Sequence, residues 1–153
     1  MGLDMELMVR WTATDESGVE WTYTDYGMEW RKANAIHGWF VRNVCGGACE
    51  NDACYDVSRE QLADLASTCR KVLDGSKIAS RTVTGFLGEP LELRYVEDTS
   101  LAESLMPTMN GFWFGSTDYG FMYIQDLERT ARQVEELLDE TPSHVTFVYR
   151  ASW

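Results

Sequence analysis

The sequence predicts a single α+β domain over residues 1–153. An antiparallel sheet, made of an N-terminal hairpin and a C-terminal strand, is expected to be covered by about three helices. Three observations lead to this fold class. Alternating apolar residues occur at both ends of the chain, apolar residues with helical spacing lie between them, and 153 residues suffice for one hydrophobic core.

The N-terminal hairpin is predicted from two runs of residues with strand character. Leu7, Val9 and Trp11 occupy every second position, which is the period of a strand with one buried face. Residues 15–18 have the composition of a turn, and residues 19–24 are rich in β-branched and aromatic side chains. We therefore expect residues 19–24 to return along the first strand.

Two helices are expected after the hairpin. The first is predicted over residues 28–45, because apolar residues recur there at spacings of three and four and a pair of glycines follows. The second begins after Ser58, which forms a capping box with Gln61, and ends at Gly75. This second helix is the more sharply marked of the two.

The second half of the chain is predicted to return to strands and then to helices. Residues 77–96 have strand character on both sides of a turn at 85–90, and residues 100–106 form a short helix. The apolar run 111–115 suits a buried strand or a tight packing turn. A long helix over 119–139 and a strand over 144–153 follow, and the long helix is expected to have its N-cap at Ser116, Thr117 or Asp118.

The charge of the chain limits the classes of partner. Lys and Arg number 13 and Asp and Glu number 25, which gives a net charge of −12. A surface this acidic repels phosphate backbones, so we expect no direct nucleic-acid binding. The sequence has no apolar run of membrane-spanning length and no signal-peptide pattern at its start, so no membrane contact is expected. The expected partner is a host protein with a basic surface.

The acidic residues form three local clusters that together define a predicted interaction surface. The last cluster lies at the C-terminal end of the long predicted helix, where each carboxylate opposes the helix macrodipole at a cost of ~0.3–1 kcal/mol. That unfavourable placement favours a role in binding over solubility alone. The clusters are Asp15, Glu16 and Glu20; Glu50, Asp52 and Asp56; and Glu135, Glu136, Asp139 and Glu140.

A possible ligand groove is the main alternative to that surface. His37 could act as a general base or as a stacking platform for a nucleobase, although a half-buried structural histidine is the commoner arrangement. No nucleophile motif, P-loop or dinucleotide fingerprint accompanies it, so neither catalysis nor a cofactor is expected. The groove would be lined by Trp30, Asn34, His37 and Trp39, with Ser116, Thr117 and Tyr119 across from them.

The cysteines offer a weaker alternative, a structural zinc site. Cys45, Cys49 and Cys54 form a C-x3-C-x4-C cluster downstream of His37, but no C-x2-C unit is present. Cys69 lies on the apolar face of its predicted helix, where a thiol behaves as a small hydrophobic group. We therefore expect no metal, and thiols that are inert or occasionally oxidised.

Three segments resemble a family of proteins. They are W-R-K-A-N-A-I-H-G-W-F-V at 30–41, V-S-R-E-Q-L at 57–62 and G-F-W-F-G-S-T-D-Y at 111–119. They are similar to segments of an uncharacterised family of small proteins carried by phages, prophages and bacterial mobile elements, and the likeness covers residues 20–153 in the same order. The resemblance implies an accessory protein that works in the cytoplasm of a bacterial host, and it implies no activity or catalytic residue.

Charge and context together favour a protein that acts by binding. The leading hypothesis is an acidic inhibitor of a host defence or nucleic-acid-processing machine, of the anti-CRISPR or anti-restriction type, whose surface imitates a phosphate backbone. A domain that binds a small ligand or nucleotide, or an enzyme, with its site around His37 is the first alternative. A virion or assembly component is the second alternative. The sequence does not indicate an oligomeric state.

Overall fold

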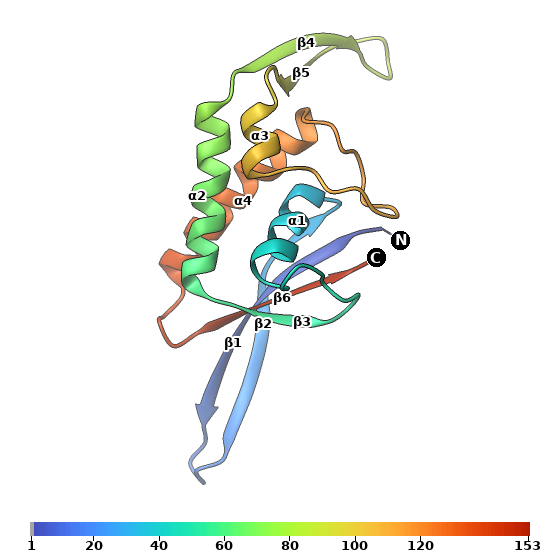
Figure 1. Cartoon of the computed structure of the whole chain (residues 1–153). Helices are drawn as coiled ribbons and strands as arrows, with labels where there is room; N and C mark the ends of the chain where they lie inside the picture. Colours follow the sequence, from blue (N-terminus) through green and yellow to red (C-terminus); the bar gives the residue numbers. More distant parts are fainter. Residues whose placement is uncertain (1) are drawn as a thin grey trace.

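The computed structural model describes residues 2–153, which form one α+β fold (Figure 1). The elements follow one another as β1 (Asp4–Thr14), β2 (Glu20–Arg31), α1 (Asn34–Asn43), β3 (Cys54–Val57), α2 (Arg59–Gly75), β4 (Ile78–Thr84), β5 (Pro90–Val96), α3 (Ser100–Leu105), α4 (Phe121–Glu140) and β6 (Thr146–Ser152). The predicted fold class is confirmed, with four helices in the described chain instead of about three.

The main sheet has four antiparallel strands in the order β2-β1-β6-β3. Figure 1 shows the helices gathered on one side of this sheet, while the far end of the β1–β2 hairpin extends beyond it. Alternate residues of the strands point into the core, as the period-two pattern predicts. Met5 and Leu7 on β1 meet Tyr149 and Phe147 of β6 in this buried layer.

The predicted start of the first helix is wrong, because β2 continues to Arg31 and α1 begins only at Asn34. Met28 pairs with Leu7 and Trp30 pairs with Met5, and both side chains are buried. Their spacing of two fits the strand, but each also falls at a helical spacing from the apolar residues of α1. Sequence periodicity alone therefore could not separate the end of the strand from the helix.

A short strand, β3, was missed by the sequence analysis, which assigned no element between the two helices that follow the hairpin. Cys54–Val57 pairs with β6 at the edge of the sheet, so that Tyr55 lies opposite Tyr149 and Val57 opposite Phe147. Because β3 has only four residues, its alternation of polar and apolar side chains is too short to be recognised as a strand period. The pairing is set by β6, which comes about a hundred positions later in the chain.

The helices that follow agree better with the sequence. Ser58 accepts a hydrogen bond from the Gln61 amide at 3.0 Å and the Gln61 side chain accepts one from the Ser58 amide at 2.9 Å, which confirms the capping box. The α4 helix begins at Phe121 with Gly120 as its N-cap and no side-chain cap. The predicted N-cap at Ser116, Thr117 or Asp118 is therefore wrong, and the Ser116 hydroxyl instead accepts a bond from the Asp118 amide at 3.1 Å.

The strands predicted over residues 77–96 are β4 and β5, which form a separate two-stranded hairpin. Its turn carries Phe86, whose side chain is fully exposed. The run 111–115 is a turn and not a strand. Phe114 is buried in it, whereas Phe112 and Trp113 point to solvent with 73% and 55% of their surface exposed.

Candidate functional site

The first and third segments of the sequence resemblance meet in space, and Asn34 joins them. This buried residue begins α1, and its amide nitrogen donates to the carbonyls of Phe114 at 3.1 Å and Ser116 at 2.7 Å. Its side-chain oxygen accepts a bond from the Met109 amide at 3.0 Å. One side-chain amide thus makes three hydrogen bonds to the 107–120 loop and clamps this loop on α1.

Residues with uncommon backbone angles surround this clamp. Lys32 and Trp113 have φ angles of 55° and 61°, in the left-handed region that side chains other than glycine rarely adopt. Gly115 has a φ of 88°, and a Cβ atom there would lie 3.0 Å from the Cβ of Lys32. Such strain collects at functional sites and persists only where the surrounding contacts enforce it. Here Leu3 bonds to both residues, because its carbonyl accepts a bond from the Lys32 amide at 2.7 Å and its amide donates to the Trp113 carbonyl at 3.3 Å.

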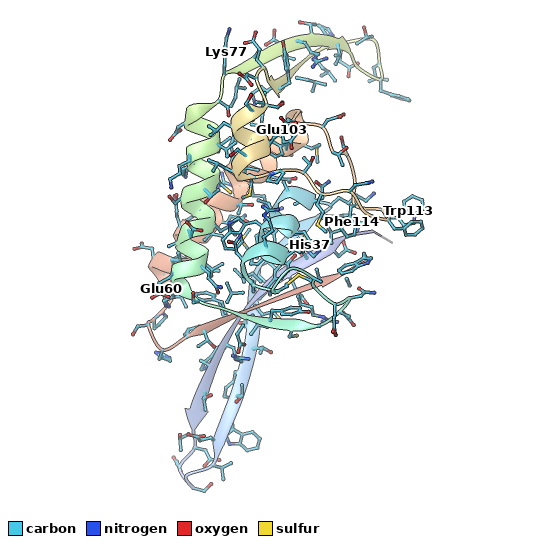
Figure 2. All side chains as sticks on the ribbon, in the orientation of Figure 1. His37, Glu60, Lys77, Glu103, Trp113 and Phe114 are labelled. Atoms are coloured by element: carbon cyan, nitrogen blue, oxygen red, sulfur yellow. A yellow bond between two sulfur atoms is a disulfide. The ribbon has the colours of Figure 1, made fainter. Side chains whose placement is uncertain are left out.

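His37 lies in the core and not at an open groove. Only 1% of its surface is exposed, and its Nδ1 atom is 2.7 Å from the hydroxyl of Tyr149. The rings of Phe114 and Trp153 stand edge-on to it, each with its centroid 5.5 Å away (Figure 2 labels His37 and Phe114). Burial lowers the pKa of His37 to about 4, so the imidazole is neutral at physiological pH. Its environment is that of a structural histidine.

Trp30 and Trp39, which the sequence analysis placed beside His37 in a groove, are also buried. The indole N–H of Trp30 donates to the hydroxyl of Thr130 on α4 at 2.8 Å, and this hydroxyl is buried as well. The ring of Trp39 stands edge-on to Phe40. The predicted groove around His37 and these two tryptophans is therefore occupied by the hydrophobic core.

Other residues of the predicted groove do reach a pocket. Asn34 and Ser116 line a hollow of about 420 Å³ between the β2–α1 connection, the 107–120 loop and the first turns of α4. Thr117 and Tyr119 stabilise the loop beside it: the Thr117 carbonyl accepts a bond from the Thr108 hydroxyl, and the Tyr119 hydroxyl accepts one from the Thr108 amide.

Sequence reasoning missed one of the charged groups that line this pocket, Asp126. It sits in the second turn of α4, where the sequence shows only one more acidic residue on a helix. Its side chain is partly buried, and burial raises the pKa of its carboxyl to about 7. No sequence motif could have identified it, because the pocket also needs the β2–α1 connection and Leu93 of β5, which folding brings to the start of α4.

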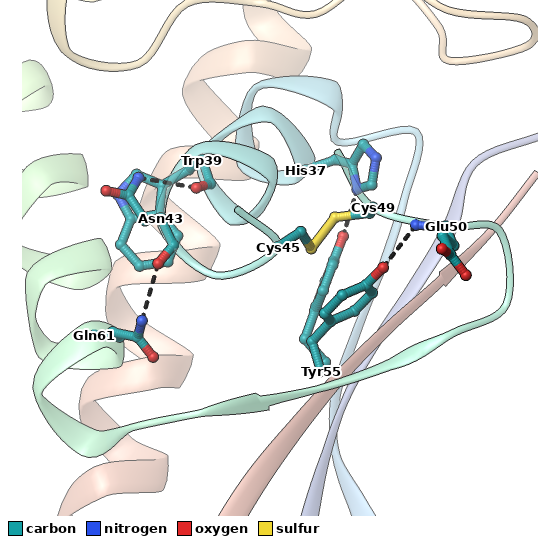
Figure 3. The surroundings of a disulfide bond; sticks show 9 residues. His37, Trp39, Asn43, Cys45, Cys49, Glu50, Tyr55 and Gln61 are labelled. Atoms are coloured by element: carbon teal, nitrogen blue, oxygen red, sulfur yellow. Dashed lines mark hydrogen bonds between the residues drawn. A yellow bond between two sulfur atoms is a disulfide. The ribbon is translucent and has the colours of Figure 1, made fainter. Parts of the chain in front are cut away.

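The predicted alternative of a zinc site is wrong, because Cys45 and Cys49 form a disulfide (Figure 3). A disulfide sulfur has no thiolate to offer a metal. Cys54 is exposed and Cys69 is buried, both as free thiols. Among residues 2–153 no three histidine, cysteine, aspartate or glutamate side chains converge on a common point.

Three of the ten acidic residues predicted to form an interaction surface are in ion pairs within the chain. Asp52 binds Arg150, Asp56 binds Arg10 at 2.8 Å, and Glu135 accepts two hydrogen bonds from Arg70. The acidic end of α4 is compensated in another way. The guanidinium of Arg59 donates to the carbonyls of Leu138 at 3.2 Å and Thr141 at 2.8 Å, which places a cation at the negative end of the helix dipole.

Three of the other seven, Asp15, Glu16 and Glu20, lie with several exposed aromatic rings in a projecting arm, which we define as residues 11–26 of the β1–β2 hairpin, whereas Glu50 precedes β3 and Glu136, Asp139 and Glu140 lie on α4. This arm contains four carboxylates and no lysine or arginine. The rings of Trp11 and Tyr23 stack with their centroids 5.6 Å apart, and Trp21 and Tyr26 have 53% and 62% of their surfaces exposed. Figure 1 shows the arm extending away from the helices.

Asp15 fixes the tip of the arm. One of its oxygens accepts bonds from the amides of Ser17 and Val19 and from the Ser17 hydroxyl, and the other accepts a bond from the indole N–H of Trp21 at 2.9 Å. These bonds, led by the Ser17 hydroxyl, hold the pKa of Asp15 well below its usual range. The carboxylates of Glu16 and Glu20 lie beside this turn and are exposed.

A second apolar surface lies where the arm meets the C-terminal end of α4, and we call it the shoulder. Here Leu137 of α4 packs 3.4 Å from the position of a Cβ on Gly27, at the irregularity in the β1–β2 register. The hollow on its surface measures about 430 Å³ and includes Val9, Trp11 and Pro142, with Glu140 at its edge. The arm and the shoulder therefore form one apolar corner bordered by carboxylates.

Comparisons of this chain with protein-family models, with curated proteins and with solved structures found no match. The resemblance to a mobile-element family thus stays a prediction from the sequence. Within residues 2–153, none of the helices combines the length and the apolar character that crossing a membrane requires.

Proposed function

We propose that this chain acts by binding another protein, and that the arm and the shoulder engage a partner with a basic surface. The observation that carries the proposal is the arm itself, an exposed ribbon with large aromatic rings and four carboxylates but no lysine or arginine. A two-stranded ribbon buries little of its own surface and is only marginally stable in water. Placing Trp21 and Tyr26 on such a ribbon is unfavourable for the free protein and favourable for an interface.

The chemistry of the arm defines the chemistry of its partner. Aromatic rings with one polar atom supply the buried centre of an interface, and charged groups around them supply orientation and a fast encounter. Because the arm carries acidic groups and no basic ones, the complementary surface has lysine or arginine around an apolar recess. Basic surfaces of this kind are common on proteins that bind nucleic acids.

We further propose the biological setting that the sequence resemblance implies. In that setting the chain is an accessory protein of a phage or mobile element, and it inhibits a defence or nucleic-acid-processing machine in the cytoplasm of a bacterial host, without catalysis of its own. The Cys45–Cys49 disulfide would be unusual in the cytoplasm of a host cell, because such bonds persist in oxidising environments and are rare in the cytosol. In the cytosol we expect this pair to be reduced, with binding unchanged, since the arm contains no cysteine.

The test is affinity purification from the native host with a tagged chain and three variants. Trp21→Ala removes an exposed ring of the arm, and Glu16→Gln with Glu20→Gln removes two charges without changing shape. Phe86→Ala is the matched control, because it removes an exposed ring from the tip of the other hairpin. Circular dichroism establishes that all the variants fold.

We expect one partner that the unmodified chain and Phe86→Ala both capture and that both arm variants lose. Raising the salt to about half-molar shortens the screening length to about 4 Å, so the captured partner should then elute. A partner that resists this salt, or that Trp21→Ala captures equally well, would overturn the proposal. A partner that Phe86→Ala loses and that the arm variants retain would also overturn the proposal.

A further inference from the structure

The outer edge of β2 is a long strand edge of the main sheet. β2 has twelve residues and forms one edge of this sheet, whereas β3 at the opposite edge has four residues. A strand at the edge of a sheet presents a row of backbone N–H and C=O groups that can pair with another chain. The fate of these groups along β2 therefore decides whether a further strand can be added there.

The hydrogen bonds at the turn of the arm show which backbone groups of β2 face this edge. The Asp15 amide donates to the Val19 carbonyl at 2.9 Å, so these two residues form a hydrogen-bonded pair. In an antiparallel ladder, such pairs alternate with pairs whose N–H and C=O groups point away from the neighbouring strand. Along the register of β1 and β2, the outward groups of the arm belong to the exposed residues Glu20, Thr22 and Thr24.

The edge is protected beyond residues 20–24 but not within them. The carboxylate of Asp25 accepts a bond from the Tyr26 amide at 2.7 Å, next to the bulge in the β1–β2 register. Arg129 of α4 donates to the carbonyl of Glu29 at 2.6 Å. Bulges and charged side chains at an edge are devices that block pairing with other chains. Within residues 2–153, no side chain bonds to the outward backbone groups of residues 20–24, and this stretch contains neither proline nor lysine.

The side chains beside the open stretch define the strand that fits it. Trp21 and Tyr23 lie on one face of β2 and threonines lie on the other, and both faces suit β-branched or aromatic neighbours. Glu20 and Asp25 lie at the two ends of the stretch, about 17 Å apart, which a strand of about six residues spans. Because opposite charges across strands stabilise a pair, a strand with basic residues near both ends is favoured.

A second copy of this chain fits the edge poorly. Pairing of two β2 strands would place two arms side by side, each with four carboxylates and no lysine or arginine. Like charges across paired strands are destabilising, and each chain carries a net charge of −12. Charge complementarity therefore favours a basic segment of another protein over self-association.

We propose that residues 20–24 of β2 bind an extended segment of the partner as an additional strand. Lysine or arginine side chains of that segment lie next to Glu20 and Asp25, and β-branched or aromatic side chains lie between them. Backbone hydrogen bonds supply the pairing, and the alternating side chains supply the selectivity. This inference rests on the proposed function of the arm, and it specifies the part of the partner that the arm recognises.

Titration of the isotope-labelled chain with a basic peptide, followed by NMR, tests strand addition. The probe is acetyl-Lys-Thr-Val-Thr-Val-Arg amide, and its control has glutamate at both ends. We expect millimolar or tighter binding, with the largest amide shifts at Thr22 and Thr24, because their N–H groups gain new acceptors. The glutamate peptide should bind at least about tenfold more weakly, because it places like charges opposite the arm.

Proline substitutions separate the backbone edge from the charge of the arm. Thr22→Pro blocks the edge and removes no bond between β1 and β2, because the Thr22 N–H points outward. Thr82→Pro is the matched control on the β4–β5 hairpin. There the Gly85 amide donates to the Glu89 carbonyl, so the same alternation turns the exposed Thr82 N–H outward.

We expect Thr82→Pro to bind the probe like the unmodified chain and Thr22→Pro to bind it at least about tenfold more weakly. Methylation of the backbone nitrogens of the probe gives the same test on the unmodified chain and should also abolish binding. Absence of millimolar binding, equal binding by Thr22→Pro or by the methylated probe, or largest shifts outside residues 20–24 would overturn the inference. A dimer of the free chain that Thr22→Pro dissociates would overturn it too, because the edge would then belong to a second copy.

Purification from the host distinguishes failure of this inference from failure of the proposed function. A partner that Trp21→Ala loses and Thr22→Pro retains supports the arm as the binding surface and overturns strand addition. Loss of the partner in both variants, with retention in Thr82→Pro, supports strand addition. If the unmodified chain captures no partner, the proposed function fails, and the peptide titration alone decides whether the edge of β2 accepts a strand.

Discussion

Replacing Asn34 by alanine should release the 107–120 loop from α1. The change leaves the carbonyls of Phe114 and Ser116 and the amide of Met109 without their partner. Each of the three hydrogen bonds contributes about 1 kcal/mol, so we expect a loss of about 3 kcal/mol in the free energy of unfolding. For a chain of this size that loss lowers the melting temperature by about 6–12 °C.

Urea unfolding followed by tryptophan fluorescence measures this loss. The matched control is Asn43→Ala, which removes one bond from an exposed asparagine at the end of the same helix and should change stability by less than about 0.5 kcal/mol. Amide exchange adds a local readout, because the Met109 N–H should lose its protection in Asn34→Ala. A loss below about 1 kcal/mol, or an equal loss in Asn43→Ala, would falsify the role of Asn34 as the clamp.

Three further predictions concern the cap, the thiols and the pH response. Ser58→Ala should cost about 1 kcal/mol in thermal unfolding, because the capping box loses its hydroxyl. Cys54 should react with a thiol reagent in the native state and Cys69 only after unfolding, since burial raises the pKa of Cys69 to about 12. Below pH 6.5 and down to about pH 4, the unfolded chain binds a proton at His37 that the folded chain excludes, so this group lowers stability as the pH falls. Asp126 acts in the opposite direction, because its raised pKa makes the folded chain bind the extra proton. Stability measured across this range should therefore fall more steeply with acid in Asp126→Asn.

The elements that sequence predicted well are those whose signals are local. The capping box at Ser58 and the alternation in β6 both depend on residues within a few positions of each other. The boundary at Arg31 was wrong because strand and helix periods overlap there, and β3 was missed because its partner β6 lies far along the chain. Short edge strands of this kind are defined by tertiary pairing and not by their own sequence.

The candidate sites likewise divide into residues that local sequence signals identify and residues that only the folded chain identifies. Asn34 and Ser116 were singled out from their segments, and the structure brings them together. The groove around His37 failed because nothing in the sequence distinguishes a buried aromatic cluster from an exposed one. Asp126 went unnoticed for the complementary reason: part of its environment, Leu93 of β5 and the β2–α1 connection, comes near α4 only in the folded chain.

The position of β6 has a consequence for how the molecule is made. This strand lies between β1 and β3, yet it is synthesised after both. Arg10 of β1, for example, donates a hydrogen bond to Thr146 of β6, which comes 136 residues later in the chain. Until residues 146–152 have left the ribosome, the inner edge of β1 is open to pairing with other chains. A net charge of −12 makes the growing chains repel one another during that interval. The acidity that suits a basic partner therefore also protects the nascent protein from aggregation.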